Sequence, residues 1–139
     1  MKPAALLFAA LFASPAWAET HEVRMFNRND RGPMIYEPDR LRIAPGDAVR
    51  FLPAQPGHNA ATIDGMIPAG AEPFKSRINE DFTVMLTVPG VYGIKCSPHF
   101  AMGMVMLIEV GEAPPPVLPD DLPARARDRF EAILARGEE

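Results

Sequence analysis

Cysteine is almost absent from this sequence. Cys96 is the only one, so the chain cannot form an internal disulfide bond. A lone thiol has four common explanations: pairing with another molecule, a metal ligand, a reactive group, or a small buried hydrophobic side chain. The first three are functional and the last is structural. The cysteine alone does not decide between them, so the decision depends on the residues around it.

No apolar run is long enough to cross a bilayer, which takes about 20 residues. The chain does open with a short one, in which Lys2 precedes the run 4–13 and the small-x-small pattern Ala16-Trp17-Ala18 follows. This order is typical of a secretory signal peptide. We therefore predict a cleaved signal at residues 1–18, a periplasmic location and no membrane segment in the mature chain.

Concentrated positive charge is lacking as well. The chain has 14 Lys and Arg against 18 Asp and Glu, which gives a formal net charge of −4. Nucleic-acid binding requires a basic face, so no nucleic-acid partner is expected. Removal of the predicted signal leaves residues 19–139, a length that suits one domain with its own core.

Helical periodicity is missing between residues 19 and 112, where short runs are separated by Gly, Pro and Asn. Apolar residues alternate with arginines along 40–51, on both sides of the turn Pro45-Gly46-Asp47, and the stretch 82–96 alternates in a similar way. Alternation with a period of two predicts β-strands with one buried face. Closely spaced short strands of this kind predict an all-β protein, an antiparallel sandwich or barrel.

The composition changes after Gly111. Five prolines within 112–123 exclude a central strand and predict an extended connector. The last residues then follow a helical period, with apolar side chains on one stripe at Leu122, Ala126, Phe130, Ile133 and Leu134. We predict a domain at residues 19–112, followed at 113–139 by a Pro-rich connector and a helix that packs on the sandwich.

Candidate metal ligands surround the cysteine. His99 and Met104 follow Cys96 across a predicted strand–loop–strand corner, and His58 follows an upstream turn. A thiolate, two imidazoles and a thioether make a soft ligand set that suits copper cycling between two oxidation states. Met102 is a second candidate thioether, and strand alternation does not separate it from Met104.

Each of these residues has an ordinary structural explanation when it is taken alone. A turn histidine, a core methionine or a surface histidine beside a proline is common. Cys96 and His99 could also form a nucleophile–base pair, although no third orienting group is evident. Zinc fits less well, because zinc sites prefer more thiolates or a third histidine. The joint placement of four such residues at turn–strand junctions favours copper.

The sequence resembles the pseudoazurins, a family of small periplasmic cupredoxins. The stretches "GHNA" and "KCSPHFAMGMV" resemble the two ligand motifs of that family. The segments "YEP", "APGD", "GMIPAGAEPFKSRINE" and "PGVYGIKC" are similar to family segments that hold no ligand. The likeness extends from about residue 22 to residue 111.

The resemblance implies a cupredoxin-like Greek-key β-sandwich of about eight strands with a C-terminal α-helical extension. It implies one type 1 copper bound by His58, Cys96, His99 and Met104. It also implies that Asn59 ties the ligand loops together, with its backbone N–H pointing at the Cys96 sulfur, and that Met34 lies near the exposed ligand His99.

A docking face around His99 is also implied by the resemblance. We expect an apolar centre formed by Met34, Pro98, Ala101 and Met102, with basic residues on its rim at Lys75, Arg77 and Lys95. The family usually has two C-terminal helices and often a lysine-rich face. This chain differs in both respects, since prolines occupy 112–123 and only two lysines follow the predicted signal.

These features together predict a periplasmic electron-transfer protein, monomeric and not an enzyme. It would accept single electrons from a cytochrome c-type donor and pass them to a terminal reductase, which the family suggests is a nitrite reductase in denitrification. The alternatives are a periplasmic protein that stores or delivers copper, and a thiol-dependent enzyme.

Overall fold

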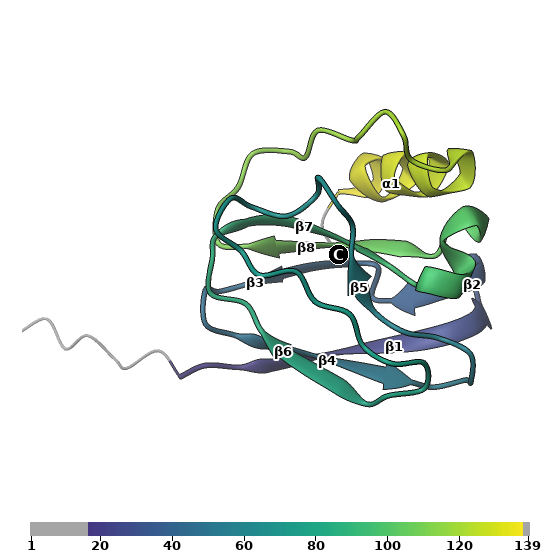
Figure 1. Ribbon diagram of the computed structural model, residues 1–139, viewed down its shortest axis with the longest axis horizontal. Helices are drawn as coiled ribbons and strands as arrows, with labels where there is room; N and C mark the ends of the chain where they lie inside the picture. Colours follow the sequence, from purple (N-terminus) through teal and green to yellow (C-terminus); the bar gives the residue numbers. More distant parts are fainter. Residues whose placement is uncertain (1–16, 138–139) are drawn as a thin grey trace, which may run out of the picture.

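The computed structural model describes residues 17–137, so residues 1–16 of the predicted signal lie outside it. Eight strands form two four-stranded sheets that pack face to face (Figure 1). One sheet has the order β2-β1-β4-β6, from strands Gly32–Glu37, Thr20–Asn29, Ala48–Pro53 and Phe82–Met85. The other has the order β3-β8-β7-β5, from strands Arg40–Ile43, Val105–Val110, Gly90–Lys95 and Ala61–Thr62. The predicted all-β sandwich is confirmed.

The predicted antiparallel pairing holds for four of the six strand pairs described, and the other two pairs are parallel. Strand β1 runs parallel to β4, with Val23 opposite Phe51, and β3 runs parallel to β8, with Leu41 opposite Ile108. The reason lies in the turns. The turn at 45–47 does not form a hairpin, because it connects β3 of one sheet to β4 of the other. The turn at Pro89 likewise connects β6 of one sheet to β7 of the other. Each crossover sends the chain to the opposite sheet, as a Greek key requires.

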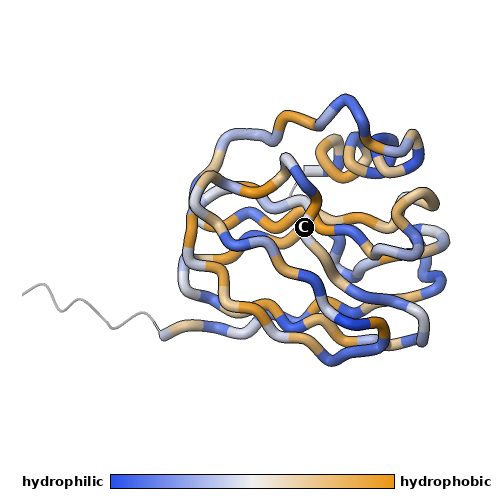
Figure 2. The backbone as a smooth tube through the Cα atoms, viewed as in Figure 1, coloured by the Kyte–Doolittle hydropathy of each residue, from blue (hydrophilic) through white to orange (hydrophobic). Residues whose placement is uncertain are grey.

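The core lies between the sheets and follows the predicted alternation. Fully buried side chains face inward from both sheets, among them Val23, Phe51, Ile94 and Ile108. Figure 2 shows apolar residues recurring along the strands of both sheets and in the helix at the top of the view. Strand β8 is buried at all six positions, so its second face must be covered from outside the sandwich.

The one α-helix among the described residues, α1 (Ala124–Arg136), supplies that cover. Its stripe of Ala126, Phe130 and Ile133 packs on Val105 and Leu107 of β8 in a second apolar cluster. The stripe follows the sequence prediction. The Pro-rich residues 112–119, which precede α1, form no helix in the structure. No helix within residues 17–137 is long and apolar enough to cross a membrane.

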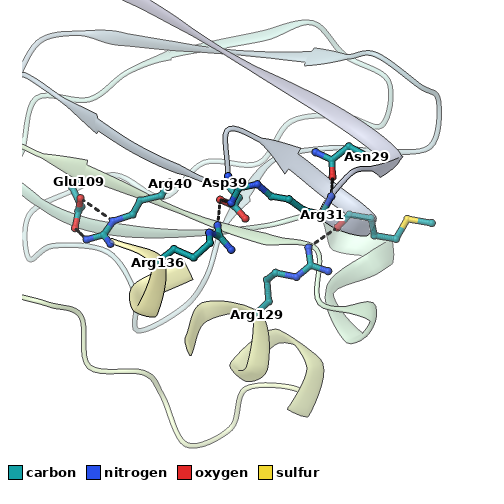
Figure 3. Close-up of polar contacts among 8 residues, drawn as sticks. Asn29, Arg31, Asp39, Arg40, Glu109, Arg129 and Arg136 are labelled. Atoms are coloured by element: carbon teal, nitrogen blue, oxygen red, sulfur yellow. Dashed lines mark hydrogen bonds and ion pairs between the residues drawn. The ribbon is translucent and has the colours of Figure 1, made fainter. Parts of the chain in front are cut away.

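A partly buried polar network fastens α1 to the sandwich (Figure 3). Asp39, only 2% exposed, accepts a hydrogen bond of 2.5 Å from Arg136 at the end of the helix. Earlier in the helix, Arg129 donates to the backbone carbonyls of Pro33 at 3.1 Å and Met34 at 3.3 Å. The helix is therefore held at two places on the loop and strand that contain residues 33–39.

Candidate metal centre

The predicted ligand loop is closed by its own backbone. Cys96 follows the last residue of β7, a 3₁₀ helix η1 (Ser97–Met102) comes next, and Met104 precedes β8. The Cys96 N–H donates to the Met104 carbonyl at 3.0 Å, and the Met104 N–H donates to the His99 carbonyl at 3.1 Å. Pro98 suits the start of η1, where an N–H would have no helical partner. The loop thus brings residues 96, 99 and 104 to one end of the sandwich.

His58 reaches the same point from the segment between β4 and β5. Its Nδ1 lies 3.7 Å from the Cys96 Sγ, and Nδ1 of His99 lies 3.5 Å from that sulfur. The two ring centroids are 5.0 Å apart. The three ligand atoms all lie within 4.8 Å of one another, which is close enough to share one metal ion.

A hydrogen bond fixes which nitrogen of His58 is available. Its Nε2 lies 2.7 Å from the side-chain oxygen of Asn27. An amide oxygen only accepts, so Nε2 carries the proton and the Nδ1 lone pair faces the sulfur. Burial, and secondly the neighbouring His99, lower the pKa of His58. The ring is therefore held neutral, as a metal ligand must be.

Cys96 is fully buried. Burial raises the pKa of its thiol, while the backbone N–H groups of Asn59 and His99 act in the opposite direction. A thiol of this kind is inert towards solutes, because the reactive thiolate is disfavoured and the sulfur has no exposed surface. A soft metal cation changes this balance, since it binds the thiolate directly.

Asn59 links the two ligand segments, as the resemblance implies. Its Oδ1 accepts a hydrogen bond from the Ser97 N–H at 2.7 Å, and its Nδ2 donates to the Ser76 carbonyl at 3.1 Å. The buried Tyr36 hydroxyl donates to the Asn59 carbonyl at 2.7 Å. Outer contacts of this type orient the ligands and tune the metal.

The two candidate methionines differ in burial. Met104 is fully buried in the same apolar cluster as Cys96, whereas Met102 is 40% exposed at the end of η1. Met104 thus shares the buried surroundings of the Cys96 sulfur, and Met102 does not, which favours Met104 as the thioether donor. This donor set of one thiol, two imidazole nitrogens and one thioether fits a type 1 copper.

The residues predicted to form the docking face divide into two groups. Pro98 and Ala101 are exposed beside half-buried His99 on η1, and Met34 is partly buried against the core, at a left-handed φ of 53°. Lys75 and Lys95 both flank Ala61 in the strand pairing and line one hollow of about 470 Å³ with Phe74 and Ser97. Arg77 is exposed but does not line that hollow.

Sequence reasoning missed Asn27, Tyr36 and Ser76, which contact His58 or Asn59. Asn27 lies on β1, 31 residues from His58, and no local pattern joins the two. Tyr36 lies within the "YEP" segment noted for its resemblance. Its apolar ring suggests only a core position, and the partner of its hydroxyl becomes visible only in the fold.

The fold and the four donors define a cupredoxin, a small β-sandwich that binds copper for electron transfer. Comparison with known proteins agrees. The family described as "Copper binding proteins, plastocyanin/azurin family" matches residues 23–111. Pseudoazurin of Paracoccus pantotrophus is 46% identical over 127 residues, 89% of this chain and 88% of that protein.

Solved structures give the same result. The crystal structures of pseudoazurins from Methylobacterium extorquens AM1 and Hyphomicrobium denitrificans both superpose with a TM-score of 0.76. They are 34% and 29% identical, respectively, and each comparison covers 86% of this chain and 99% of the other. The chain therefore belongs to the plastocyanin/azurin family of copper-binding proteins, and within it to the pseudoazurins, which are electron-transfer copper proteins.

Proposed function

We propose that this protein is a periplasmic electron shuttle whose single copper is bound by His58, Cys96, His99 and Met104. The observation that carries the proposal is the convergence of a buried thiol and two imidazole nitrogens within 4.8 Å. One imidazole, that of His99, is half-buried beside exposed residues of η1, whereas His58 is fully enclosed. The half-buried ring offers an electron a short route to the surface.

The arrangement favours a carrier over an enzyme. Four protein donors leave no ligand position for a substrate, and the Cys96 sulfur has no exposed surface. The hydrogen bonds between Asn59 and Ser97 join the two ligand segments and resist rearrangement when the metal changes oxidation state. Little rearrangement is the physical requirement for fast electron transfer, and a rigid site also opposes release of the metal.

The alternative function, copper storage or delivery, is tested by reversibility. We expect the copper-loaded protein to complete repeated cycles of reduction and reoxidation with full recovery of its visible absorption and no loss of copper to a competing chelator. Measurement of bound copper after each cycle decides between the two functions. Ready transfer of reduced copper to the chelator would favour delivery.

Met104 is expected to be the axial ligand. Met104→Gln should lower the reduction potential, because an amide oxygen is a harder ligand and favours copper(II). Met102→Gln is the matched control and should have much less effect, since Met102 is 40% exposed. Both potentials can be measured by redox titration of the visible band. A larger shift in the Met102 variant would show that Met102, and not Met104, is the axial ligand.

The acceptor we propose is a nitrite reductase, docked over an apolar patch of Met34, Pro98, Ala101 and Met102, with a cytochrome c-type protein as donor. Lys75, Arg77 and Lys95 would orient the encounter from the rim. Rim charges act mainly on the association rate and are screened over about 8–10 Å at physiological salt. Lys75 and Lys95 line the same hollow from either side of Ala61, which brings two of these charges to one region of the surface.

Reversal of both lysines to glutamate should slow electron transfer to a copper nitrite reductase at low salt and flatten its dependence on ionic strength. The reduction potential should stay unchanged, because Lys75 is exposed and the Lys95 Nζ lies over the Phe100 ring, 5.0 Å from its centroid. The second-order rate constant measured against ionic strength checks this. If the double variant matches the parent and Ala101→Asp is also harmless, docking occurs on another face.

A further inference from the structure

A second group of metal-binding side chains lies at the opposite end of β1 from the copper ligands. Glu19, His21 and Asp47 bring one ligand atom each to within 4.8 Å of one another. Asn27, the partner of His58, lies six positions beyond His21 along β1, which corresponds to roughly 20 Å. The group is therefore separate from the copper centre and takes no part in the proposed electron transfer.

The parallel pairing of β1 with β4 assembles this group. Thr20 lies opposite Ala48 and His21 opposite Val49, and the Glu19 carbonyl accepts a hydrogen bond from the Ala48 N–H at 2.8 Å. Asp47, which immediately precedes β4, is thereby placed beside His21. Segments 26 residues apart in sequence thus contribute to one cluster.

The distances fit a shared ion. The His21 Nε2 lies 2.9 Å from the Asp47 Oδ2. Two ligands about 2.0–2.2 Å from one ion, at nearly a right angle, are separated by about that distance. The Glu19 Oε2 lies 3.9 Å from the same nitrogen, and its side chain is 75% exposed, so it is free to close on an ion.

Asp47 is prepared for this role by its backbone contacts. Its Oδ1 accepts from the Glu19 nitrogen and its Oδ2 from the Ala44 N–H, both at 3.0 Å, and its side chain is only 8% exposed. Cleavage after Ala18 would make that Glu19 nitrogen the free amino group of the mature chain, still beside Asp47. Hydrogen bonds from Glu19 and His21 lower the pKa of this carboxyl group. The carboxylate is thus fixed and ionised, and an ion bound between its Oδ2 and the His21 Nε2 would replace the hydrogen bond that joins them.

The cluster opens into a hollow large enough for an ion and its water ligands. Its volume of about 810 Å³ is that of the uncleaved chain, in which Trp17 of the predicted signal forms part of the wall. The hollow is also lined by Glu112, which adds negative charge, and by Arg42, which lies 3.8 Å from Glu109. This cavity is an observation separate from the donor distances, and it gives an ion direct access from solvent.

We propose that Glu19, His21 and Asp47 form a second metal site, which binds a divalent ion of the borderline class that includes Zn(II) and Cu(II). One imidazole nitrogen with carboxylate oxygens is a common donor set for such ions. The site has no sulfur donor, so it selects divalent ions over copper(I). Binding would cross-link the start of β1 to the turn before β4.

The test is titration of the copper-loaded protein with Zn(II) by calorimetry. We expect one Zn(II) per chain, no change in the visible copper band, and a rise in melting temperature that grows with Zn(II) concentration. Loss of a residue that only hydrogen-bonds to a metal ligand weakens metal binding about 10–100-fold. Loss of His21, a proposed ligand, should weaken Zn(II) binding by at least that factor. Replacement by glutamine, His21→Gln, keeps an amide that can still hydrogen-bond to Asp47.

Two further variants make the result decisive. Glu19→Gln changes an exposed side chain without touching the fold and should also weaken binding, whereas Glu22→Gln, an exposed carboxylate three residues along the same strand, should not. Absence of Zn(II) binding to the parent, or equal binding by the parent and the His21 and Glu19 variants, would overturn the site. Neither outcome bears on electron transfer, which is tested separately by repeated reduction and reoxidation of the copper-loaded protein.

Discussion

Replacement of Cys96 by serine should abolish the intense visible absorption of the copper-loaded protein. That absorption comes from charge transfer between a thiolate and copper(II), and Cys96 is the only thiol in the chain. The fold should survive, because serine is close in size to cysteine and the N–H groups of Asn59 and His99 already point at this position. Absorption spectra with urea unfolding curves separate the two effects.

The matched control for Cys96→Ser is Ala101→Ser, which adds a hydroxyl to an exposed position of the same loop. It should keep both the band and the stability. A Cys96→Ser protein that retained an intense band would show that the thiolate does not bind copper. A variant that lost its fold along with its colour would be uninformative, so the unfolding midpoint has to be measured on the metal-free proteins as well.

The parts of the fold that were predictable from sequence are those set by local chemistry. The alternation of apolar residues predicted the strands, since a period of two buries one face of a sheet. The stripe of Ala126, Phe130 and Ile133 gave the helix and its buried side, and all three are fully buried. The three proposed ligands around η1, Cys96, His99 and Met104, lie within nine residues, so a short loop joins them whatever the topology.

Pairings between distant segments could not be read from the sequence in this way. The alternation along 40–51 is compatible with a hairpin, and only the destination of each strand shows that 45–47 joins different sheets. Asn27 and Asp47 acquire their roles from the parallel pairing of β1 with β4, since each contacts a residue 26 or more positions away. Local periodicity carries no information on such partners.

The contact between α1 and the ligand loop could not be predicted from local periodicity either. Gly103, which ends η1 and precedes Met104, has a φ of 88°, and a Cβ built on it would lie 2.8 Å from the Arg125 carbonyl oxygen. Phe100 of η1 also packs in the apolar cluster that α1 covers. The helix thus closes against the loop on which three of the four proposed ligands lie, and it does so where only a glycine fits.

Gly103→Ala should therefore disturb both stability and the copper site. A left-handed φ costs a non-glycine residue about 1–2 kcal/mol, and the new methyl group must displace the helix or the loop, which adds about 1–3 kcal/mol. Because Met104 is the next residue, we expect a shifted visible band as well as a lower free energy of unfolding. Urea unfolding and the absorption spectrum of the copper-loaded protein measure these changes.

Gly70→Ala is the control that isolates the contact with α1. Gly70 has a φ of 84°, close to that of Gly103, but a Cβ there would have no neighbour within 4 Å. It should therefore show the backbone cost of about 1–2 kcal/mol alone, with an unchanged spectrum. If the two alanine variants were equally stable and had the same spectrum, the helix would cover β8 without constraining the ligand loop. A larger loss confined to Gly103→Ala would make α1 part of the support of the copper site.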